Sequence, residues 1–349
     1  MDVWYTPHHH THHGHGELIG GELLSGFELP VRAERVRAAF LAARLGEVHA
    51  AQDHGLAPIV AVHDAAYVEF LRGAWTEWRA LGRTHPALGM VWHAGLGAPR
   101  IAPRHIEGRL GFYSMDAGCA IVEGTWNAAY WSAQLALTAA QAVLDGAPAG
   151  LAICRPPGHH AAAATMGGYC YLNNAAIAAQ ALLGARFPRV GVLDIDYHHG
   201  NGTQAIFWQR DDVFFTSLHA DPHDDYPYLS GHADEVGEGA GHGHTLNFPL
   251  PAGTLAPAYM AALEASIDAV IAKRCGVVVV SLGVDTFEKD PISKFKLNSN
   301  DYLEIGRRLQ RLAVPLLFVF EGGYATHEVG LNAVNVLIGF ERGYGPWAR

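Results

Sequence analysis

An apolar run turns into a polar block within the stretch Val190-Gly191-Val192-Leu193-Asp194-Ile195-Asp196-Tyr197-His198-His199-Gly200-Asn201-Gly202-Thr203. The run predicts a buried strand, and because side chains alternate faces along a strand, Asp194, Asp196 and His198 are expected on one side. Burying two carboxylates on a central strand is costly unless they bind a cation. An Asp-x-His pair at strand spacing can supply an oxygen and a nitrogen to one divalent metal. The alternative is that both aspartates cap the following turn while the histidines pack in the core.

Similar short apolar runs recur along the second half of the chain. They do not alternate with polar residues, which is typical of strands buried on both faces and therefore of a parallel sheet. The predicted strands are Gly150–Cys154, Val190–Ile195, Val213–His219, Val277–Leu282 and Leu316–Phe320. The stretches with helical periodicity between them are Asn127–Leu144, Leu172–Leu183, Ala256–Ala272 and Tyr302–Leu312. This alternation predicts an α/β sandwich, in which ligands bind at the carboxyl ends of the strands.

A carboxylate follows a second strand of the predicted sheet. Asp285 comes directly after Val277–Leu282, and together with Asp196 and His198 it would give a divalent ion three protein ligands. Three ligands with open positions for water and substrate are the pattern of a catalytic metal site rather than a structural one. Taken alone, Asp285 is more often a helix N-cap before Thr286.

Two further strand ends carry polar motifs. Arg155-Pro156-Pro157-Gly158-His159-His160 forces a turn that presents two adjacent imidazoles, and histidine can both take and return a proton near neutral pH. Glu321-Gly322-Gly323-Tyr324 places a phenol that could donate a hydrogen bond to an oxyanion. Taken singly, a histidine would be structural and the tyrosine would lie on a surface turn. Together, the strand ends supply the parts for amide hydrolysis.

The composition restricts the class of protein. The 349 residues carry a net charge of −10, with 17% charged and 50% hydrophobic residues. Such a chain is globular and lacks the clustered surplus of Lys and Arg that nucleic acid or an anionic membrane would attract. The cysteines, which form no CxxC pair, are Cys119, Cys154, Cys170 and Cys275. They predict a reducing compartment, and without a secretory leader or a membrane-length apolar run we expect a cytoplasmic protein.

One segment, at about residues 81–125, breaks the strand and helix rhythm. It is rich in Gly, Pro, Arg and His and has no convincing periodicity. A structureless loop of that length inside a compact domain is either a misassignment or a functional insertion. Since no internal repeat or linker-like stretch is visible, we expect residues 1–349 to form a single domain that contains this insertion.

Several long motifs of this chain resemble the histone deacetylase superfamily, over most of residues 1–340. They are Cys154–His160, Gly167–Cys170 with Asn173-Asn174, Asp194–Thr203, Ser281–Asp285 and Glu321–Tyr324. The resemblance implies an arginase-like, three-layer α/β/α sandwich around a mainly parallel sheet of about eight strands. It also implies a single deacetylase domain that depends on Zn²⁺, or alternatively on Fe²⁺.

The resemblance further implies roles for the motif residues. The implied metal ligands are Asp196, His198 and Asp285. The implied catalytic residues are His160 as main general base and acid, His159 as its electrostatic partner against Asp194, and Tyr324 as the hydroxyl that polarises the carbonyl.

Asn201 departs from the pattern of eukaryotic lysine deacetylases, many of which have Asp at this position. A neutral amide should raise the pKa of His160 less than a carboxylate would, so the division of work between the two histidines stays open. The resemblance also implies an inner potassium site. Its ligands would be Asp194, Ser217 and the backbone carbonyls of Asp196, His198 and Leu218.

Within the superfamily, the chain is most similar to bacterial acetylpolyamine amidohydrolases. The supporting stretches are Gly16–Leu23, Arg109–Tyr113, Gly283–Glu288, Asp290–Ser293 and the segment 81–125. In that group the inserted loop builds a dimer interface and narrows the channel, where acidic side chains bind a cationic amine, so a homodimer is implied. Glu107 matches one such acid, and the second falls at Gly118, with Asp116 nearby. The implied substrate-binding residues are Glu107, Asp116, Gly168, Tyr169, Tyr226 and Ile19.

Three functions compete. The leading one is removal of acetyl groups from N-acetylated polyamines or short cationic amines such as acetylputrescine or acetylcadaverine, which suit an acidic protein. A protein acetyl-lysine deacetylase of class II type would use the same chemistry, although a narrowed entrance disfavours a folded substrate. A non-enzyme alternative is metal storage by the histidine-rich N-terminus. Its histidines are His8, His9, His10, His12, His13 and His15. Two interpretations of this tract stay open: it faces solvent without a function, or it acts near the entrance to the site or in metal capture.

Overall fold

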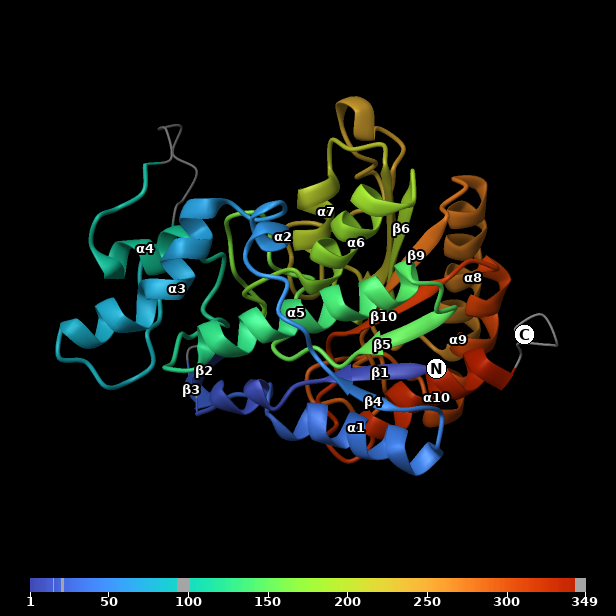
Figure 1. Cartoon of the computed structure of the whole chain (residues 1–349), viewed down its shortest axis with the longest axis horizontal. Helices are drawn as coiled ribbons and strands as arrows, with labels where there is room; N and C mark the ends of the chain where they lie inside the picture. Colours follow the sequence, from blue (N-terminus) through green and yellow to red (C-terminus); the bar gives the residue numbers. More distant parts are fainter. Residues whose placement is uncertain (15, 20–21, 93–100, 343–349) are drawn as a thin grey trace.

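The computed structural model describes residues 1–14, 16–19, 22–92 and 101–342. Among these residues, an eight-stranded sheet has the order β4-β1-β5-β10-β9-β6-β7-β8, and its neighbouring strands pair parallel (Figure 1). The strands are β1 (Asp2–Tyr5), β4 (Val48–Ala50), β5 (Ala149–Ala152), β6 (Val190–Asp194), β7 (Val213–Ala220), β8 (Thr245–Leu250), β9 (Val277–Leu282) and β10 (Leu316–Phe320). A separate antiparallel hairpin pairs β2 (Gly16–Ile19) with β3 (Glu22–Ser25).

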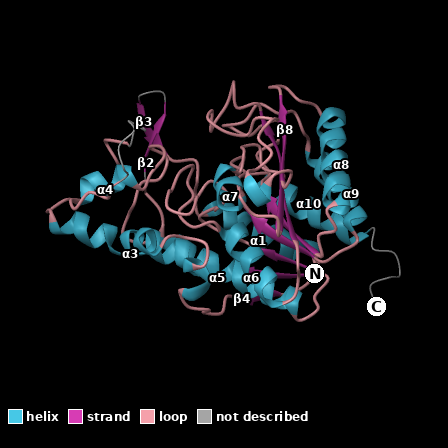
Figure 2. Ribbon diagram, turned by 90° about the horizontal axis from the view of Figure 1, so that it is seen from above, coloured by secondary structure: helices cyan, strands magenta, loops and turns pink. Residues whose placement is uncertain are grey.

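Helices cover both faces of the sheet, which confirms the predicted three-layer α/β/α sandwich (Figures 1 and 2). The helices on one face are α1 (Val31–Ala43), α8 (Ala256–Ala272), α9 (Ser299–Leu309) and α10 (Val329–Arg342). Those on the other face are α5 (Thr125–Leu144), α6 (Asn174–Ala185) and α7 (Asn201–Phe207). Short 3-10 helices are η1 (Pro7–Thr11), η2 (Gly239–Gly241) and η3 (Gln310–Leu312).

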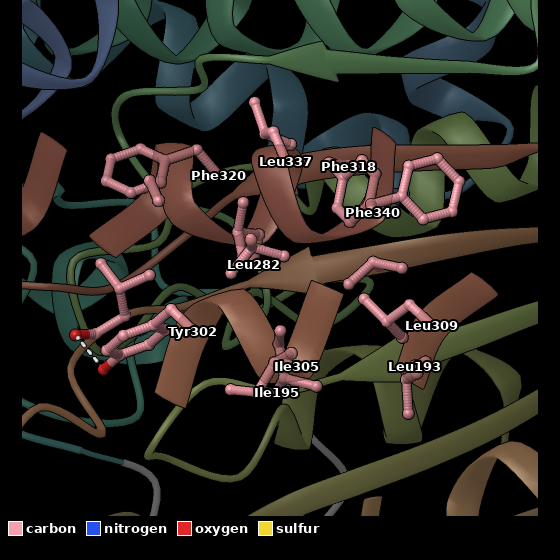
Figure 3. Packing of buried hydrophobic residues seen from close by; sticks show 14 of the residues in the cluster. Leu193, Ile195, Leu282, Tyr302, Ile305, Leu309, Phe318, Phe320, Leu337 and Phe340 are labelled. Atoms are coloured by element: carbon pink, nitrogen blue, oxygen red, sulfur yellow. Dashed lines mark hydrogen bonds between the residues drawn. The ribbon is translucent and has the colours of Figure 1, made fainter. Parts of the chain in front are cut away.

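Alternate side chains of the strand β9 pack into the apolar layers on the two faces of the sheet. Val278 and Val280 pack into the cluster that contains α8, α9 and α10, whereas Val277 and Val279 pack into the cluster that contains α5 and α6. Figure 3 shows part of the first cluster. Truncating a large buried side chain in such a layer costs about 2–5 kcal/mol, so the strands and the positions of their ends are held firmly.

Most predicted elements appear with bounds that differ by a few residues or less. β9, β10 and α8 have the predicted bounds, and α9 ends early because η3 completes the predicted stretch. α6 begins later than predicted because the Asn173 side chain accepts a hydrogen bond from Ala176 N and caps the helix there. The short edge strand β4 was not predicted, since three partly exposed residues carry no recognisable pattern.

The segment 81–125 is more structured than its composition suggests. It contains α4 (Ile106–Phe112), which went unpredicted because seven residues with two glycines show no clear period, and Ala87 pairs with Ile121 in an antiparallel bridge. With α3 (Ala65–Ala80) and α2 (Ala57–Val60) it contributes to a third apolar cluster, and Figure 1 shows α3 and α4 at the left. Residues 93–100 lie outside the described part, and a dimer interface here stays a prediction.

Across the described ranges, no helix combines the length and the apolarity needed to cross a membrane.

Candidate active site

Three ligand-type side chains meet beyond the carboxyl ends of β6 and β9. Asp196, His198 and Asp285 each contribute one ligand atom within 4.8 Å of the others, and all three residues are buried. His198 Nδ1 lies 3.1 Å from Asp285 Oδ2 and 3.4 Å from Asp196 Oδ1. The parallel register sets Asp194 of β6 opposite Ser281 of β9, which brings the two strand ends together. Two carboxylates and one imidazole suit Zn²⁺ or Fe²⁺, with room left for water and substrate.

Backbone groups hold the two carboxylates in place. Tyr197 N donates to Asp285 Oδ1 at 2.8 Å, and Gly322 N donates to Asp196 Oδ2 at 2.8 Å. A Cβ atom on Gly322 would overlap the Asp285 carboxylate, and one on Gly283 would overlap that of Asp196. The glycines of these two loops are therefore required by the close approach of backbone to ligand.

The electrostatics of the trio are those of a cation site. Burial raises the pKa of Asp285 to about 7, and the neighbouring Asp196 carboxylate adds to the rise. Burial acts in the same direction on Asp196, but the charges of His159 and His198 hold its pKa below the usual range. Two carboxylates sharing a dry site repel each other, and a bound divalent cation relieves that repulsion.

His159 and His160 lie side by side after the Pro156-Pro157 turn, with ring centroids 4.0 Å apart. His159 Nδ1 lies 3.0 Å from Asp194 Oδ2, and His160 Nδ1 lies 2.7 Å from Asn201 Oδ1. An amide oxygen can only accept, so Nδ1 of His160 carries the proton and its Nε2 is left as a base.

The two histidines have opposite pKa shifts. Burial lowers the pKa of His159, but the Asp196 and Asp194 carboxylates outweigh this and raise it to about 10. For His160, burial and the neighbouring His159 and His198 lower the pKa well below its usual value. The Asp196 and Asp194 carboxylates therefore favour the cationic form of His159, whereas burial and the two neighbouring imidazoles favour the neutral form of His160.

Tyr324 is held at the site through its backbone. Tyr324 N donates to Asp290 Oδ2 at 2.6 Å, and the guanidinium carbon of Arg32 lies 4.6 Å from the centroid of the Tyr324 ring. Glu321, from the same motif, accepts from Gly158 N at 2.6 Å and so joins the tyrosine loop to the histidine turn. The sequence carried no signal for Asp290 as a loop anchor, since its contacts are to backbone groups far away along the chain.

A pocket of about 300 Å³ leads to these groups. Its lining residues are Glu17, Leu18, Asp116, Ala117, Gly118, His160, Gly168, Tyr169, His198, Asp225, Tyr226, Ile292 and Tyr324. The structure thus brings four of the predicted substrate-binding residues to one cavity, together with three of the predicted catalytic and ligand residues. Glu17 was missed, because an isolated glutamate in a short hairpin has no spacing that marks it.

Acidic and aromatic side chains are paired along the pocket. Tyr169 O–H donates to Glu17 Oε2 at 2.7 Å, and Tyr226 O–H donates to Asp116 Oδ2 at 2.6 Å. Gly168 N also donates to Asp116 Oδ2, at 2.9 Å. A cavity with aromatic walls and carboxylates suits an aliphatic chain that ends in an ammonium group.

Two predicted substrate-binding residues are not placed in this cavity. Glu107 lies on α4, where it pairs with Arg83, and it does not line the pocket of its own chain. Ile19 ends β2, and its side chain lies outside the described residues.

The predicted potassium ligands lie on two adjacent strands and the loop after β6. Parallel pairing of β6 with β7 sets Asp194 opposite Ser217, and Leu218 follows in β7. Burial raises the pKa of Asp194. The site itself stays a prediction.

The N-terminal histidines are only partly solvent-facing. His9 and His12 are buried, because the buried Arg155 guanidinium donates to both of their backbone carbonyls. The expectation of a solvent-facing tract is therefore wrong for these two. His13 is exposed, and His15 lies outside the described residues.

Comparisons with known proteins identify the family of the chain. A sequence profile of the histone deacetylase domain matches residues 27–339. The chain is 51% identical over 337 residues to acetylpolyamine amidohydrolase 2 of Pseudomonas aeruginosa, covering 97% of this chain and 98% of that protein. It is 47% identical over 339 residues to acetylpolyamine amidohydrolase of Mycoplana ramosa, covering 97% and 99%.

A solved structure is similar over almost the whole chain. The crystal structure of acetylpolyamine aminohydrolase from Burkholderia pseudomallei matches with a TM-score of 0.94 at 39% identity, covering 99% of this chain and 100% of that one. The family profile, the relatives and the fold all point to the same family. The chain therefore belongs to the histone deacetylase family.

Proposed function

We propose that this protein is a metal-dependent amide hydrolase that removes acetyl groups from N-acetylated polyamines or similar small cationic amines, of the acetylputrescine or acetylcadaverine type. The observation that carries the proposal is one cavity in which carboxylates and tyrosines lead to His160, His198 and Tyr324. The relatives named acetylpolyamine amidohydrolase support the substrate class.

Asp196, His198 and Asp285 would hold the ion, Zn²⁺ or alternatively Fe²⁺. When bound, such an ion acidifies water and polarises the acetyl carbonyl. His160 Nε2 takes the proton of the attacking water and returns it to the leaving amine. Tyr324 O–H donates to the carbonyl oxygen as negative charge develops there.

The positive charge of His159 contributes to the same step. It lies beside His160 and is balanced by Asp194, so it stabilises negative charge near the reacting carbonyl without transferring a proton itself. A structural potassium ion at Asp194, Ser217 and the carbonyls of Asp196, His198 and Leu218 would fit the buried oxygen-rich edge of β6 and β7.

A homodimer and a cytoplasmic location are part of the proposal. Exposed apolar side chains at Met90, Val91 and Ile101 in the segment 81–125 suit an interface between copies. Glu107, which does not line the pocket of its own chain, would face the partner's pocket across such an interface. All four cysteines are free and buried, which suits a reducing compartment.

The test compares kcat/KM of the zinc-loaded protein for acetylputrescine, acetylcadaverine and a peptide containing acetyl-lysine. The small amines are expected to react faster, because the carboxylates and tyrosines of the pocket suit a cationic amine on an aliphatic chain. Much faster turnover of the peptide would overturn the substrate class, and no hydrolysis of any of the three would overturn the activity.

A further inference from the structure

Two histidines and a glutamate converge at a second place, away from the pocket. His9 and His10 lie on η1, and Glu34 lies in the first turn of α1. The Nε2 atoms of His9 and His10 are 3.2 Å and 2.8 Å from the same oxygen, Glu34 Oε1. In Figure 1, the dark-blue N-terminal segment lies beside the left end of α1.

We propose that His9, His10 and Glu34 bind a second divalent transition-metal ion, such as Zn²⁺, with water completing its coordination. One ligand atom from each residue lies within 4.8 Å of the other two. Ligands about 2.0–2.1 Å from a tetrahedral zinc ion are about 3.3 Å apart, and the distances of 3.2 Å and 2.8 Å from the two nitrogens to Glu34 Oε1 are close to that spacing. Two imidazoles and one carboxylate form a donor set that favours zinc over magnesium or calcium.

Neighbouring groups fix this arrangement before any ion arrives. Arg155 Nη1 donates to His9 O at 2.5 Å, which anchors η1 to the core. The Tyr5 hydroxyl donates to Glu34 Oε1 and lies 3.2 Å from His9 Nε2. A hydrogen bond of this kind orients a ligating carboxylate and strengthens metal binding. The donor atoms therefore need little further ordering to bind an ion.

The site has one closed side and one open side. The His9 side chain is 2% exposed, whereas those of His10 and Glu34 are 52% and 32% exposed. The open side gives an ion an entry path and room for water.

The competing explanation is a hydrogen-bonded cluster without an ion. Arg37 Nη1 lies 3.7 Å from Glu34 Oε2 and already offsets part of its charge. The two explanations differ in zinc uptake, since a hydrogen-bonded cluster binds none. This inference does not depend on the proposed function, because it concerns other residues and a binding measurement.

The experiment titrates the full chain with Zn²⁺ in competition with a chromophoric chelator. Wild type should bind one more ion than His10→Ala or Glu34→Gln, or bind it at least about 10-fold more tightly. His13→Ala is the matched control, because it removes an exposed histidine of the same tract, and it should bind as wild type does. Circular dichroism checks that each variant is folded.

Equal zinc uptake by wild type, His10→Ala and Glu34→Gln would overturn the proposal. An equal loss in His13→Ala would also overturn it, since binding would then belong to the tract as a whole. A loss confined to His10→Ala and Glu34→Gln would establish it.

Discussion

Among the residues that the structure describes, histidines and carboxylates gather at two places, at the carboxyl ends of β6 and β9 and where η1 lies near the first turn of α1. In the first group every ligand-type residue is buried. In the second only His9 is buried, while His10 is exposed and Glu34 is intermediate. The first group is built by strand register, and the second by side chains of a short 3-10 helix that meet a side chain in the first turn of α1.

The two groups differ in how far the backbone fixes the positions of their side chains. At the strand ends, backbone N–H groups hold both aspartates, and glycines allow the chain to approach them closely. At the N-terminus, the glutamate is held by the side chains of Tyr5, His9 and His10 rather than by backbone groups. A histidine-rich stretch of sequence is therefore a weaker indication of an active site than carboxylates at the ends of buried parallel strands are.

One buried ion cluster connects the two regions. Glu28 Oε1 accepts from Arg32 Nη1 at 2.7 Å and from Arg155 Nε at 2.8 Å, and all three side chains are fully buried. Arg155 precedes the histidine turn and also binds the carbonyls of His9 and His12. Loss of Glu28 should therefore loosen both regions at once.

The largest predicted effect is on stability, in Glu28→Gln. Removing one partner leaves two buried guanidinium groups without their carboxylate, which should lower the free energy of unfolding in urea by about 3–5 kcal/mol. The control is Glu69→Gln, which breaks the exposed pair with Arg72 and should change stability by less than about 1 kcal/mol. Equal effects of the two substitutions would contradict the assigned role.

Next in size is the effect of Tyr324→Phe, which tests chemistry at the strand ends alone. Loss of one oxyanion donor should reduce kcat by about 10²–10³-fold, or about 2.7–4 kcal/mol, while the protein keeps its metal. Steady-state rates on acetylputrescine measure the loss of kcat, and metal analysis measures whether the ion is retained. The control is Tyr228→Phe, which removes the hydroxyl of a largely exposed tyrosine. Turnover near that of wild type in Tyr324→Phe would remove the tyrosine from the mechanism.

The strand ends were predictable because they combine two strong patterns. Runs such as Val277–Leu282 are buried on both faces, and the polar residues that follow them must lie at one edge of the sheet. The register of β6 with β9 then brings Asp196, His198 and Asp285 together. No contact between distant segments was needed to find them.

Other features depend on contacts that a single sequence does not display. Glu17 reaches the pocket through the hairpin β2–β3, and Asp290 acts through backbone N–H groups of Tyr324 and Ala325. α4 has too few residues for a period to show. The burial of His9 depends on Arg155, which is 146 residues away along the chain. Each of these follows from tertiary packing rather than from local pattern.

A third prediction concerns His63, a buried histidine outside both groups. Burial lowers its pKa from 6.5 to about 4, and its Nε2 accepts from Asn173 N at 2.9 Å. The unfolded chain binds this proton more readily than the folded one, so His63 removes stability as pH falls from about 6.5 to about 4. The full effect is about 3 kcal/mol, and about 2 kcal/mol of it is lost by about pH 5.

Urea unfolding at about pH 7 and about pH 5 measures this contribution. In His63→Gln the loss of stability on acidification should be smaller than in wild type by about 2 kcal/mol. Other buried histidines, such as His219, contribute equally to both proteins and cancel. The control is His13→Ala, which removes an exposed histidine and should keep the wild-type pH dependence. An unchanged pH dependence in His63→Gln would contradict the prediction.

The smallest predicted effect is on substrate preference, and it distinguishes the charge of a pocket carboxylate from its role in the shape of the pocket wall. Asp116→Asn removes one negative charge beside Tyr226 and Gly168, so it should weaken the preference for a cationic substrate. Two unit charges about 4 Å apart in water interact by about 1 kcal/mol, so the ratio of kcat/KM for acetylputrescine to that for neutral N-acetylbutylamine should fall about 5-fold. The control is Glu123→Gln, which removes an exposed charge in the same segment and should leave the ratio unchanged. If both substrates slowed equally in Asp116→Asn, the carboxylate would be supporting the pocket wall through its hydrogen bonds rather than attracting the amine.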